Sequence, residues 1–191
     1  MIYKMDPGFL HLILGPMFSG KTTRLIHEYN SRRENQEKVA AINYSGDTRY
    51  HETLLSTHDK IMIDCIQCDS LKEVRLDDDV SVVLINEGQF FTDIYEGVLE
   101  WVENQGKTVY VFALDGDFQR KPFGEIYRLI PLADTVEKLA AGCAGCSRET
   151  PARFSYRVSN EVRQVSIGCD YVPLCRKCYR RKNEHSNRGS I

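Results

Sequence analysis

The sequence predicts an α/β fold with a mostly parallel sheet and a small second lobe near the C-terminus. Short apolar runs alternate with segments of helical spacing between residues 9 and 114. A glycine-rich pattern typical of phosphate binding lies at 15–22, and two CxxC pairs follow residue 140. We therefore expect a P-loop parallel-sheet nucleotide-binding domain followed by a ribbon-like zinc lobe.

Composition limits the function classes. The chain has 191 residues, of which 42% are hydrophobic and 27% charged, with a net charge of −2. This is enough for one domain plus a small appendage, and no overall basic field would recruit nucleic acid. No apolar stretch approaches the roughly 20 residues of a membrane span. The N-terminus has no signal-peptide pattern, and seven cysteines do not pair evenly, so we expect a cytoplasmic protein without disulfides.

The first part of the chain reads as alternating strands and helices. The run at 80–85 is nearly all β-branched, as in a strand buried on both faces. The segment 46–59 is polar and is expected to be a loop, and 71–74 is expected to be a helical turn. Strands are expected at 9–14, 38–44, 61–67, 80–85 and 107–114, and helices at 22–34 and 94–106.

The character of the chain changes near residue 140. Two short strands, 153–158 and 162–168, are expected between the cysteine pairs. The division that we expect is a P-loop domain at 1–140, a zinc lobe at 141–180 and a polar, disordered tail at 181–191.

The stretch GPMFSGKT at 15–22 fits the pattern G-x-x-x-x-G-K-[ST] between an expected strand and an expected helix. Its glycines let backbone N–H groups turn toward phosphate oxygens at a helix N-terminus. Lys21 would reach the β and γ phosphates, and the Thr22 hydroxyl would ligate Mg²⁺. The phosphate-binding candidates are Gly15, Pro16, Met17, Phe18, Ser19, Gly20, Lys21 and Thr22.

The late cysteines predict a closed zinc site. Two CxxC turns supply four thiolates, which complete a tetrahedral structural site, and the four ligands are Cys143, Cys146, Cys175 and Cys178. The alternatives are a redox dithiol or free core cysteines. A third match, Cys65-x-x-Cys68, lies in an expected strand, where residues three apart point to opposite faces, so we expect free thiols there.

Polar residues end the strand at 80–85. Glu87, in NEGQFF at 86–91, could be a Mg²⁺ ligand, a general base or a solvated loop acid, and these three roles stay open on the residues alone. Phe90 and Phe91 are more typical of a core than of a ligand site. Arg49, in DTRY at 47–50, could stabilise charge on a transferring phosphoryl group.

Taken together, these stretches resemble the type II thymidine kinases, the family of the human cytosolic and poxviral enzymes. The matches cover nearly the whole chain in the family's order, and ALDGDFQRKPFG is the most specific of them. They are LILGPMFSGKTT (12–23), DTRY (47–50), STHD (56–59), NEGQFF (86–91), GKTV (106–109), ALDGDFQRKPFG (113–124) and CxxC…YxxxCxxC (143–178).

The resemblance implies a kinase of nucleotide salvage that transfers the γ-phosphoryl of ATP, with Mg²⁺, to the 5′-hydroxyl of thymidine. It also implies a structural Zn²⁺, a homotetramer, and no nucleic-acid or membrane partner. Glu87 matches the general base, and Asp47, Arg49, Asn86 and Gln89 match further ATP-binding positions. The thymidine-binding positions implied are Met17, Phe90, Leu114, Phe118, Phe123, Gln164, Val165, Ser166, Ile167, Gly168 and Tyr171, of which 164–168 form the family's lasso segment.

Three departures from the family pattern stand out. Asn86 replaces an acid, which removes a charge beside the expected magnesium site. The segment 168–171 is shorter than usual, and 152–157 is slightly longer, with Ser155 matching a substrate-contacting threonine. A P-loop ATPase whose zinc lobe binds nucleic acid or a partner is the competing hypothesis, but it leaves NEGQFF and ALDGDFQRKPFG unexplained. An inactive relative is suggested by Asn86 alone.

Overall fold

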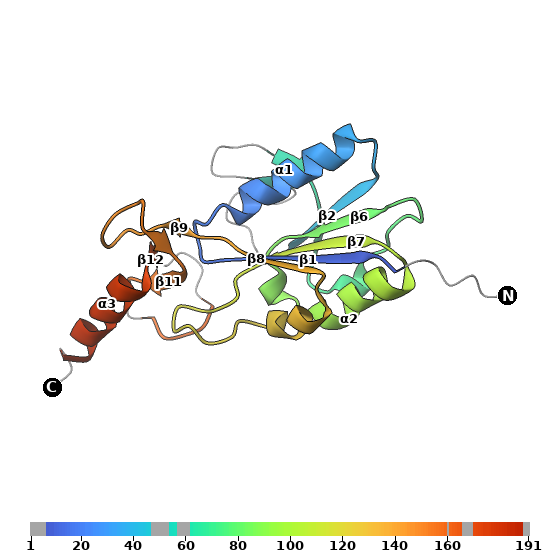
Figure 1. Cartoon of the computed structure of the whole chain (residues 1–191). Helices are drawn as coiled ribbons and strands as arrows, with labels where there is room; N and C mark the ends of the chain where they lie inside the picture. The colour runs from blue at the N-terminus through green and yellow to red at the C-terminus, as the bar shows by residue number, and fades with distance from the viewer. Residues whose placement is uncertain (1–6, 47–53, 57–61, 160, 166–169, 189–191) are drawn as a thin grey trace.

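The computed structural model describes residues 7–46, 54–56, 62–159, 161–165 and 170–188 (Figure 1). At its centre is a six-stranded parallel sheet in the order β5-β2-β6-β7-β1-β8. The predicted α/β class with a parallel sheet is therefore confirmed. The strands are β1 (Phe9–Leu14), β2 (Val39–Tyr44), β5 (Ile66–Cys68), β6 (Val82–Ile85), β7 (Thr108–Ala113) and β8 (Thr135–Lys138).

Side chains of the central strands alternate between two hydrophobic clusters. On β7, Val109 and Val111 face one cluster, whereas Tyr110 and Phe112 face the other. This is the period of two that a strand imposes, and burial on both sides explains why β6 and β7 are nearly continuous apolar runs. All four residues of β6 are buried.

Helices cover both faces of the sheet (Figure 1). On one face, α1 (Lys21–Glu34) buries Leu25 and Ile26. On the other face lie α2 (Ile94–Leu99) and the 3₁₀ segment η4 (Ile126–Leu132). The helix expected at 94–106 is present but changes to a π turn, η3 (Glu100–Asn104), in which Trp101 and Val102 are buried. The predicted turn at 71–74 is the 3₁₀ segment η1 (Leu71–Glu73).

The expected strand at 61–67 is two strands. β4 (Met62–Asp64) pairs antiparallel with β3 (Leu54–Ser56), and β5 then joins the edge of the main sheet. The segment 46–59, expected to be a loop, therefore contains a strand. Leu55 and Ile63 lie opposite each other and are buried against the cluster beneath α1, so two apolar residues decide the pairing in a polar stretch.

The C-terminal lobe has its own small core. It contains two antiparallel pairs, β9 (Ala141–Gly142) with β10 (Pro151–Ala152), and β11 (Phe154–Arg157) with β12 (Tyr171–Leu174). The expected strand at 153–158 is confirmed as β11. The strand expected at 162–168 is wrong over the described residues 161–165, where Val162 is 78% exposed and no apolar face is buried.

The structure also differs at the C-terminus. Helix α3 (Arg176–Arg188) continues well past residue 181, where a disordered tail was expected. Tyr179 anchors its first turns because it is 3% exposed, and Asn183 donates to the Tyr179 carbonyl. No helix in the described part of the chain has the length and apolar character needed to cross a membrane.

Candidate active site

The loop between β1 and α1 has the form of a phosphate-binding loop. Gly20 has φ +82°, a left-handed conformation that glycine adopts without strain, and it directly precedes the helix. The Lys21 ammonium donates to the carbonyl oxygens of Gly15 at 3.1 Å and Pro16 at 2.9 Å, so it lies folded over the loop. Ser19 Oγ is buried without a hydrogen-bond partner among the described residues. These groups fit a triphosphate.

Glu87 follows β6 in a conformation that is unusual for a side-chain-bearing residue, with φ +53°. The adjacent Gly88 packs so closely against β7 that a Cβ atom would lie 2.7 Å from Val111 Cγ1. The turn therefore packs against the neighbouring strand at a distance that leaves room only for glycine. Residues held in such sparsely populated conformations cluster at functional sites.

The Gln89 side chain connects Glu87 to β7. Its amide nitrogen donates to Glu87 Oε2, and its amide oxygen accepts from the Leu114 backbone N–H at 2.9 Å. Gln89 is only 3% exposed. Both ends of its amide are thus engaged within the protein, one with Glu87 and the other with the end of β7.

A ladder of amides joins the carboxyl ends of three strands. Asn86 Nδ2 donates to Asn43 Oδ1 at 2.8 Å, and Asn43 Nδ2 donates to Gln67 Oε1 at 3.1 Å. Gln67 in turn donates to Cys65 Sγ at 3.3 Å. Asn43 and Asn86 are 2% and 3% exposed, so the ladder satisfies polar groups that would be costly to bury alone. Asn86 thus belongs to a neutral network.

The two phenylalanines of NEGQFF have different environments. Phe91 is 1% exposed and belongs to the core. Phe90 is half-buried, stacks on Tyr44 with ring centroids 5.1 Å apart, and meets Phe123 edge-to-face at 5.4 Å. The structure therefore brings together Phe90 and Phe123, two of the residues predicted to enclose thymine, next to the turn that carries Glu87.

Asp117 organises the segment 115–124. Its Oδ1 accepts from the backbone N–H groups of Gln119 at 2.8 Å and Lys121 at 2.9 Å. Its Oδ2 accepts from the Gln164 amide at 2.9 Å, which ties this segment to the predicted lasso. Asp117 is 6% exposed, so its charge is balanced by these donors within the fold.

Two hydrogen bonds made by buried residues of the C-terminal lobe reach the phosphate loop and the segment 115–124. Ser155 Oγ, on β11, accepts from the Met17 backbone N–H of the phosphate loop at 2.9 Å. The Tyr179 hydroxyl, on α3, donates to the Phe118 carbonyl at 2.6 Å. Both residues are buried, at 4% and 3% exposed. The lobe therefore supports both the phosphate loop and the segment 115–124.

The four predicted cysteine ligands lie together. The sulfur atoms of Cys143, Cys146, Cys175 and Cys178 are all within 4.8 Å of one another. Four sulfurs at about 2.3 Å from a tetrahedral zinc ion would be spaced about 3.8 Å apart, so the cluster fits that ion. Among the described residues no other group of this kind occurs.

Backbone hydrogen bonds at the cluster favour the thiolate form of Cys143. Burial alone would raise the pKa of the Cys143 thiol, but the backbone N–H groups of Cys175 and Gly145 donate to its sulfur and lower the pKa to about 6. Cys178 is the opposite case, because burial and the neighbouring cysteines raise its pKa to about 12. Backbone donors to a metal-binding sulfur are the second-shell arrangement expected at a zinc site.

The other cysteine pair is unlike this cluster. Burial raises the pKa of the Cys65 thiol, and it raises that of Cys68 to about 11. Both are free cysteines. Cys65 lies between β4 and β5, so the two residues do not share one strand as expected.

Some predicted site residues cannot be placed, and some contacts were not predicted. Asp47, Arg49, Ser166, Ile167 and Gly168 lie outside the described residues. The sequence motifs did not identify five residues that organise the site through long-range contacts, although one of them, Asp117, lies within the motif ALDGDFQRKPFG. They are Asn43, Gln67, Asp117, Arg157 and Tyr179.

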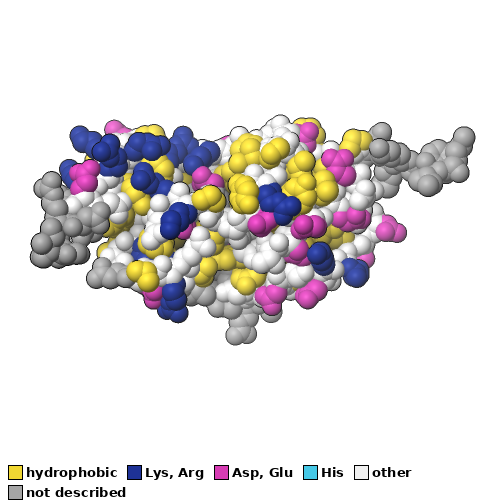
Figure 2. Space-filling view, turned by 90° about the horizontal axis from the view of Figure 1, so that it is seen from below, with side chains coloured by type: hydrophobic (Ala, Val, Ile, Leu, Met, Phe, Trp, Pro, Cys, Tyr) yellow, Lys and Arg dark blue, Asp and Glu magenta, His cyan; other side chains and the backbone are white. Residues whose placement is uncertain are grey.

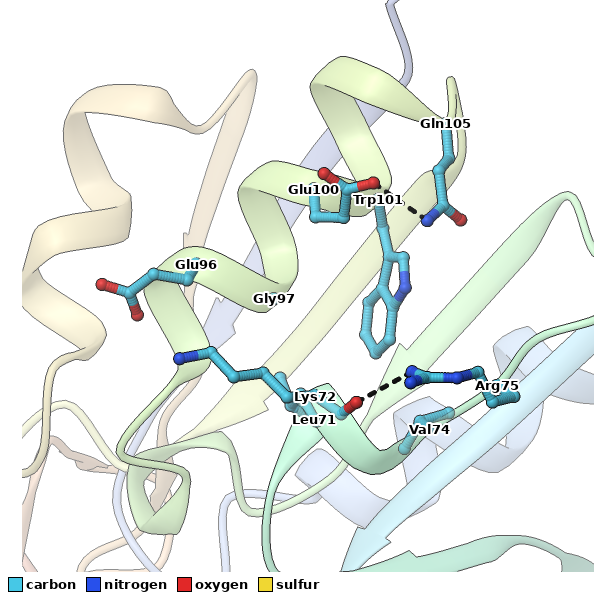
Figure 3. A pocket seen from close by; sticks show the side chains of 9 residues that line it. All are labelled: Leu71, Lys72, Val74, Arg75, Glu96, Gly97, Glu100, Trp101 and Gln105. Carbon is cyan, nitrogen blue, oxygen red and sulfur yellow. Dashed lines mark hydrogen bonds between the residues drawn. The ribbon is translucent and has the colours of Figure 1, made fainter.

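A shallow groove lies elsewhere on the molecule. It has a volume of about 360 Å³ and is lined by residues of η1 and of the α2–η3 helix, with Lys72 and Arg75 on one side and Glu96 and Glu100 on the other. Figure 3 shows the Trp101 indole directed toward η1 between these two sides. None of the predicted site residues lines it, so it is separate from the candidate active site.

The fold and the site define a nucleotide-binding protein of the phosphate-loop class with a cluster of four cysteines that fits a metal ion. A family model described as thymidine kinase matches residues 8–179. Proteins called thymidine kinase from vaccinia virus (strain Ankara) and monkeypox virus are each 46% identical over 181 residues, which covers 92% of this chain and 98% of the relative. The raccoon poxvirus protein of the same name is 46% identical over 179 residues. The chain belongs to the thymidine kinase family.

Proposed function

We propose that this enzyme transfers the γ-phosphoryl of ATP to the 5′-hydroxyl of thymidine and produces thymidine monophosphate. The main observation in support of this function is the buried Gln89 amide. It holds the Glu87 carboxylate at the carboxyl edge of the sheet, where the phosphate loop also lies. Ligands bind at this edge in open α/β sheets. We also propose that the chain divides into a nucleotide-binding part at 1–140 and a zinc lobe that begins at residue 141 and includes all of α3, that it forms a homotetramer and that it acts in the cytoplasm.

The phosphate loop would hold the triphosphate of ATP. Its backbone N–H groups, the Lys21 ammonium and Ser19 Oγ present positive or donor groups to phosphate oxygens. Thr22 would hold Mg²⁺, which when bound neutralises charge on the β and γ phosphates. We propose Asp47 and Arg49 as further ATP contacts and Asn86 as an acceptor for a water of the Mg²⁺ shell.

Glu87 would accept the proton of the attacking 5′-hydroxyl as general base. Phosphoryl transfer requires the acceptor oxygen in line with the phosphorus, so the position of the base matters as much as its basicity. The φ of +53° and the bond from Gln89 fix that position before any substrate binds. A preorganised base of this kind loses no free energy to reorientation during the reaction.

The thymine ring would lie among the aromatic residues beside this turn. Phe90 and Phe123, which already meet edge-to-face, together with Phe118, would form the apolar walls. We assign Met17 and Leu114 to the same pocket. The remaining nucleoside contacts proposed are Gln164, Val165, Ser166, Ile167, Gly168 and, toward the sugar, Tyr171.

The competing hypothesis, a zinc lobe that binds nucleic acid, rests on the basic stretch 176–182. Figure 2 shows Lys and Arg side chains gathered at the end of the molecule that carries α3. However, Arg176 lies over the Phe154 ring at 4.9 Å and Lys182 over Tyr156 at 5.5 Å, so part of this charge covers the lobe's own aromatic residues. The lobe's contacts with the active site support a structural role instead.

A phosphotransfer assay tests the proposal. Each of the four deoxynucleosides is incubated with ATP and Mg²⁺, and nucleoside monophosphate is measured by chromatography. We expect thymidine to be phosphorylated and the Lys21→Met variant to provide the background. A thymidine rate no higher than that background would exclude the proposed function and would favour an inactive relative or an ATPase.

Replacing Asn86 by Asp should lower the Mg²⁺ concentration needed for half-maximal activity. The added carboxylate attracts the cation. Rotation of the Asn43 amide, together with that of Gln67, whose oxygen accepts from Asn43, would let the Asn43 nitrogen donate to Asp in place of the lost bond. An added attraction of about 1 kcal/mol between the carboxylate and Mg²⁺ corresponds to a decrease of about five-fold in that Mg²⁺ concentration. A Mg²⁺ titration at constant ATP measures it. The double variant Asn86→Asp/Asn43→Leu, which lacks the donor, is the control for the amide rotation, and an unchanged titration would mean that either residue serves.

Replacing Gln89 by Met should lower kcat about ten-fold with little change in the KM for ATP. Methionine has a similar shape but makes neither bond, so the Glu87 carboxylate loses the donor that fixes it. A charge-assisted hydrogen bond of about 1.5 kcal/mol corresponds to this factor. Steady-state kinetics with varied ATP distinguishes this result from the ATP-binding role, which predicts a higher KM for ATP at unchanged kcat.

A further inference from the structure

Arg157 is a buried charged residue that the proposed mechanism does not use. It lies at the end of β11 and is only 4% exposed. Its hydrogen-bond partners in the described part of the chain are all neutral, namely three backbone carbonyls and a phenol. Burying a guanidinium without a carboxylate partner is costly even when its donors are satisfied, so this arrangement needs an explanation beyond packing.

The three carbonyls belong to one short segment. Arg157 Nη1 donates to the carbonyl oxygens of Glu161 at 2.8 Å and of Arg163, and Nη2 donates to that of Gln164 at 2.9 Å. The segment 161–165 forms no strand or helix of its own, and Val162 and Val165 are exposed. Three of its carbonyl oxygens are therefore held by the planar fork of one arginine, whose five fixed donors suit several acceptors at once, while the Gln164 side chain adds the bond to Asp117.

The same side chain reaches two other segments. Its Cζ atom lies 3.8 Å from the centroid of the Phe118 ring, and its Nε donates to the Tyr171 hydroxyl at 2.9 Å. Cation–π attraction at this distance favours a Phe118 ring that keeps its face toward the guanidinium. Arg157 therefore joins the segments 115–124 and 161–165 and the strand β12, each of which carries residues assigned above to the nucleoside.

We propose that Arg157 is a positioning residue for the nucleoside site, which fixes Phe118, Gln164 and Tyr171 relative to one another. The inference rests on the proposed function for its effect on thymidine. Its effect on the segment 161–165 is independent of any substrate. Because Arg157 contacts neither the phosphate loop nor Glu87 in the described structure, its loss should weaken nucleoside binding and leave ATP binding and the chemical step largely unchanged.

The test uses Arg157→Met and Arg157→Lys with Arg153→Met as matched control. Arg153 is an exposed arginine four residues earlier in the same lobe. We expect Arg157→Met to raise the KM for thymidine at least ten-fold, with the KM for ATP and kcat within about two-fold of the parent, because several bonds to a charged donor are lost. The KM for thymidine of Arg157→Lys should lie between those of the parent and Arg157→Met, since one ammonium group cannot reproduce the planar fork of donors.

Backbone hydrogen exchange of the full-length protein provides the second readout. Amides of 161–165 should exchange faster in both Arg157 variants than in the parent and in Arg153→Met. If Arg157→Met fails to fold, Arg157→Lys carries the test. Unchanged exchange at 161–165, or an unchanged KM for thymidine in Arg157→Lys, would overturn the proposal. Faster exchange in the Arg157 variants, combined with a parent enzyme that does not phosphorylate thymidine, would retain the positioning role and reject the proposed function.

Discussion

Replacing Glu87 by Gln is expected to lower kcat by roughly 10²-fold or more, the scale of a lost general base. Glutamine has nearly the same shape, and its amide oxygen can still accept the bond from Gln89, so the turn at φ +53° should persist. Only the capacity to take a proton is removed. Single-turnover and steady-state kinetics with saturating ATP and thymidine measure the effect.

Two further measurements make the Glu87 prediction specific. The KM values for both substrates should stay within about three-fold, because the carboxylate is assigned to the transition state more than to ground-state binding. Glu87→Asp, which keeps the charge but shortens the reach, should lose nearly as much rate if position matters. If turnover is unaffected by Glu87→Gln, Glu87 is not the general base, and the interpretation as a solvated loop acid is favoured.

The sheet was predictable because its strands are buried on both faces. Continuous apolar runs such as Val82–Ile85 indicate a strand whatever their tertiary surroundings, and the glycine-rich loop fixes the first strand–helix connection. The pairing of β3 with β4 was not predictable, since only Leu55 and Ile63 are buried in a polar stretch. Nor was β12 predictable as the partner of β11, because β12 contains Pro173, an unfavourable strand residue.

Some residues of the candidate site were likewise predictable from the sequence and others were not. The four cysteines and Lys21 were found because their motifs place all the relevant residues within a few positions of one another. Arg157 and the amide pair Asn43–Asn86 were missed because their partners come from separate strands or loops. A polar residue in an apolar strand is the available signal for such contacts, but a single sequence does not identify the partner.

Removal of the metal, or Cys178→Ser, is expected to disrupt the lobe and to lower kcat/KM for both substrates by more than ten-fold. Cys143 and Cys178 are two of the five buried residues in the core of the lobe, so packing alone supplies little stability. Apparent binding energies of structural zinc sites are about 10–16 kcal/mol, which makes the ion the main source of order in such a lobe. Without it, the bonds from Met17 to Ser155 and from Tyr179 to Phe118 would no longer support the phosphate loop and the segment 115–124.

Metal content, measured by mass spectrometry, should fall from about one zinc per chain, and ATP affinity should fall together with thymidine affinity. Cys65→Ser, outside the cluster, is the matched control and should retain both metal and activity. A chelated protein with normal ATP and thymidine kinetics would show that the lobe is ordered without the ion and that its contacts with the phosphate loop do not depend on zinc.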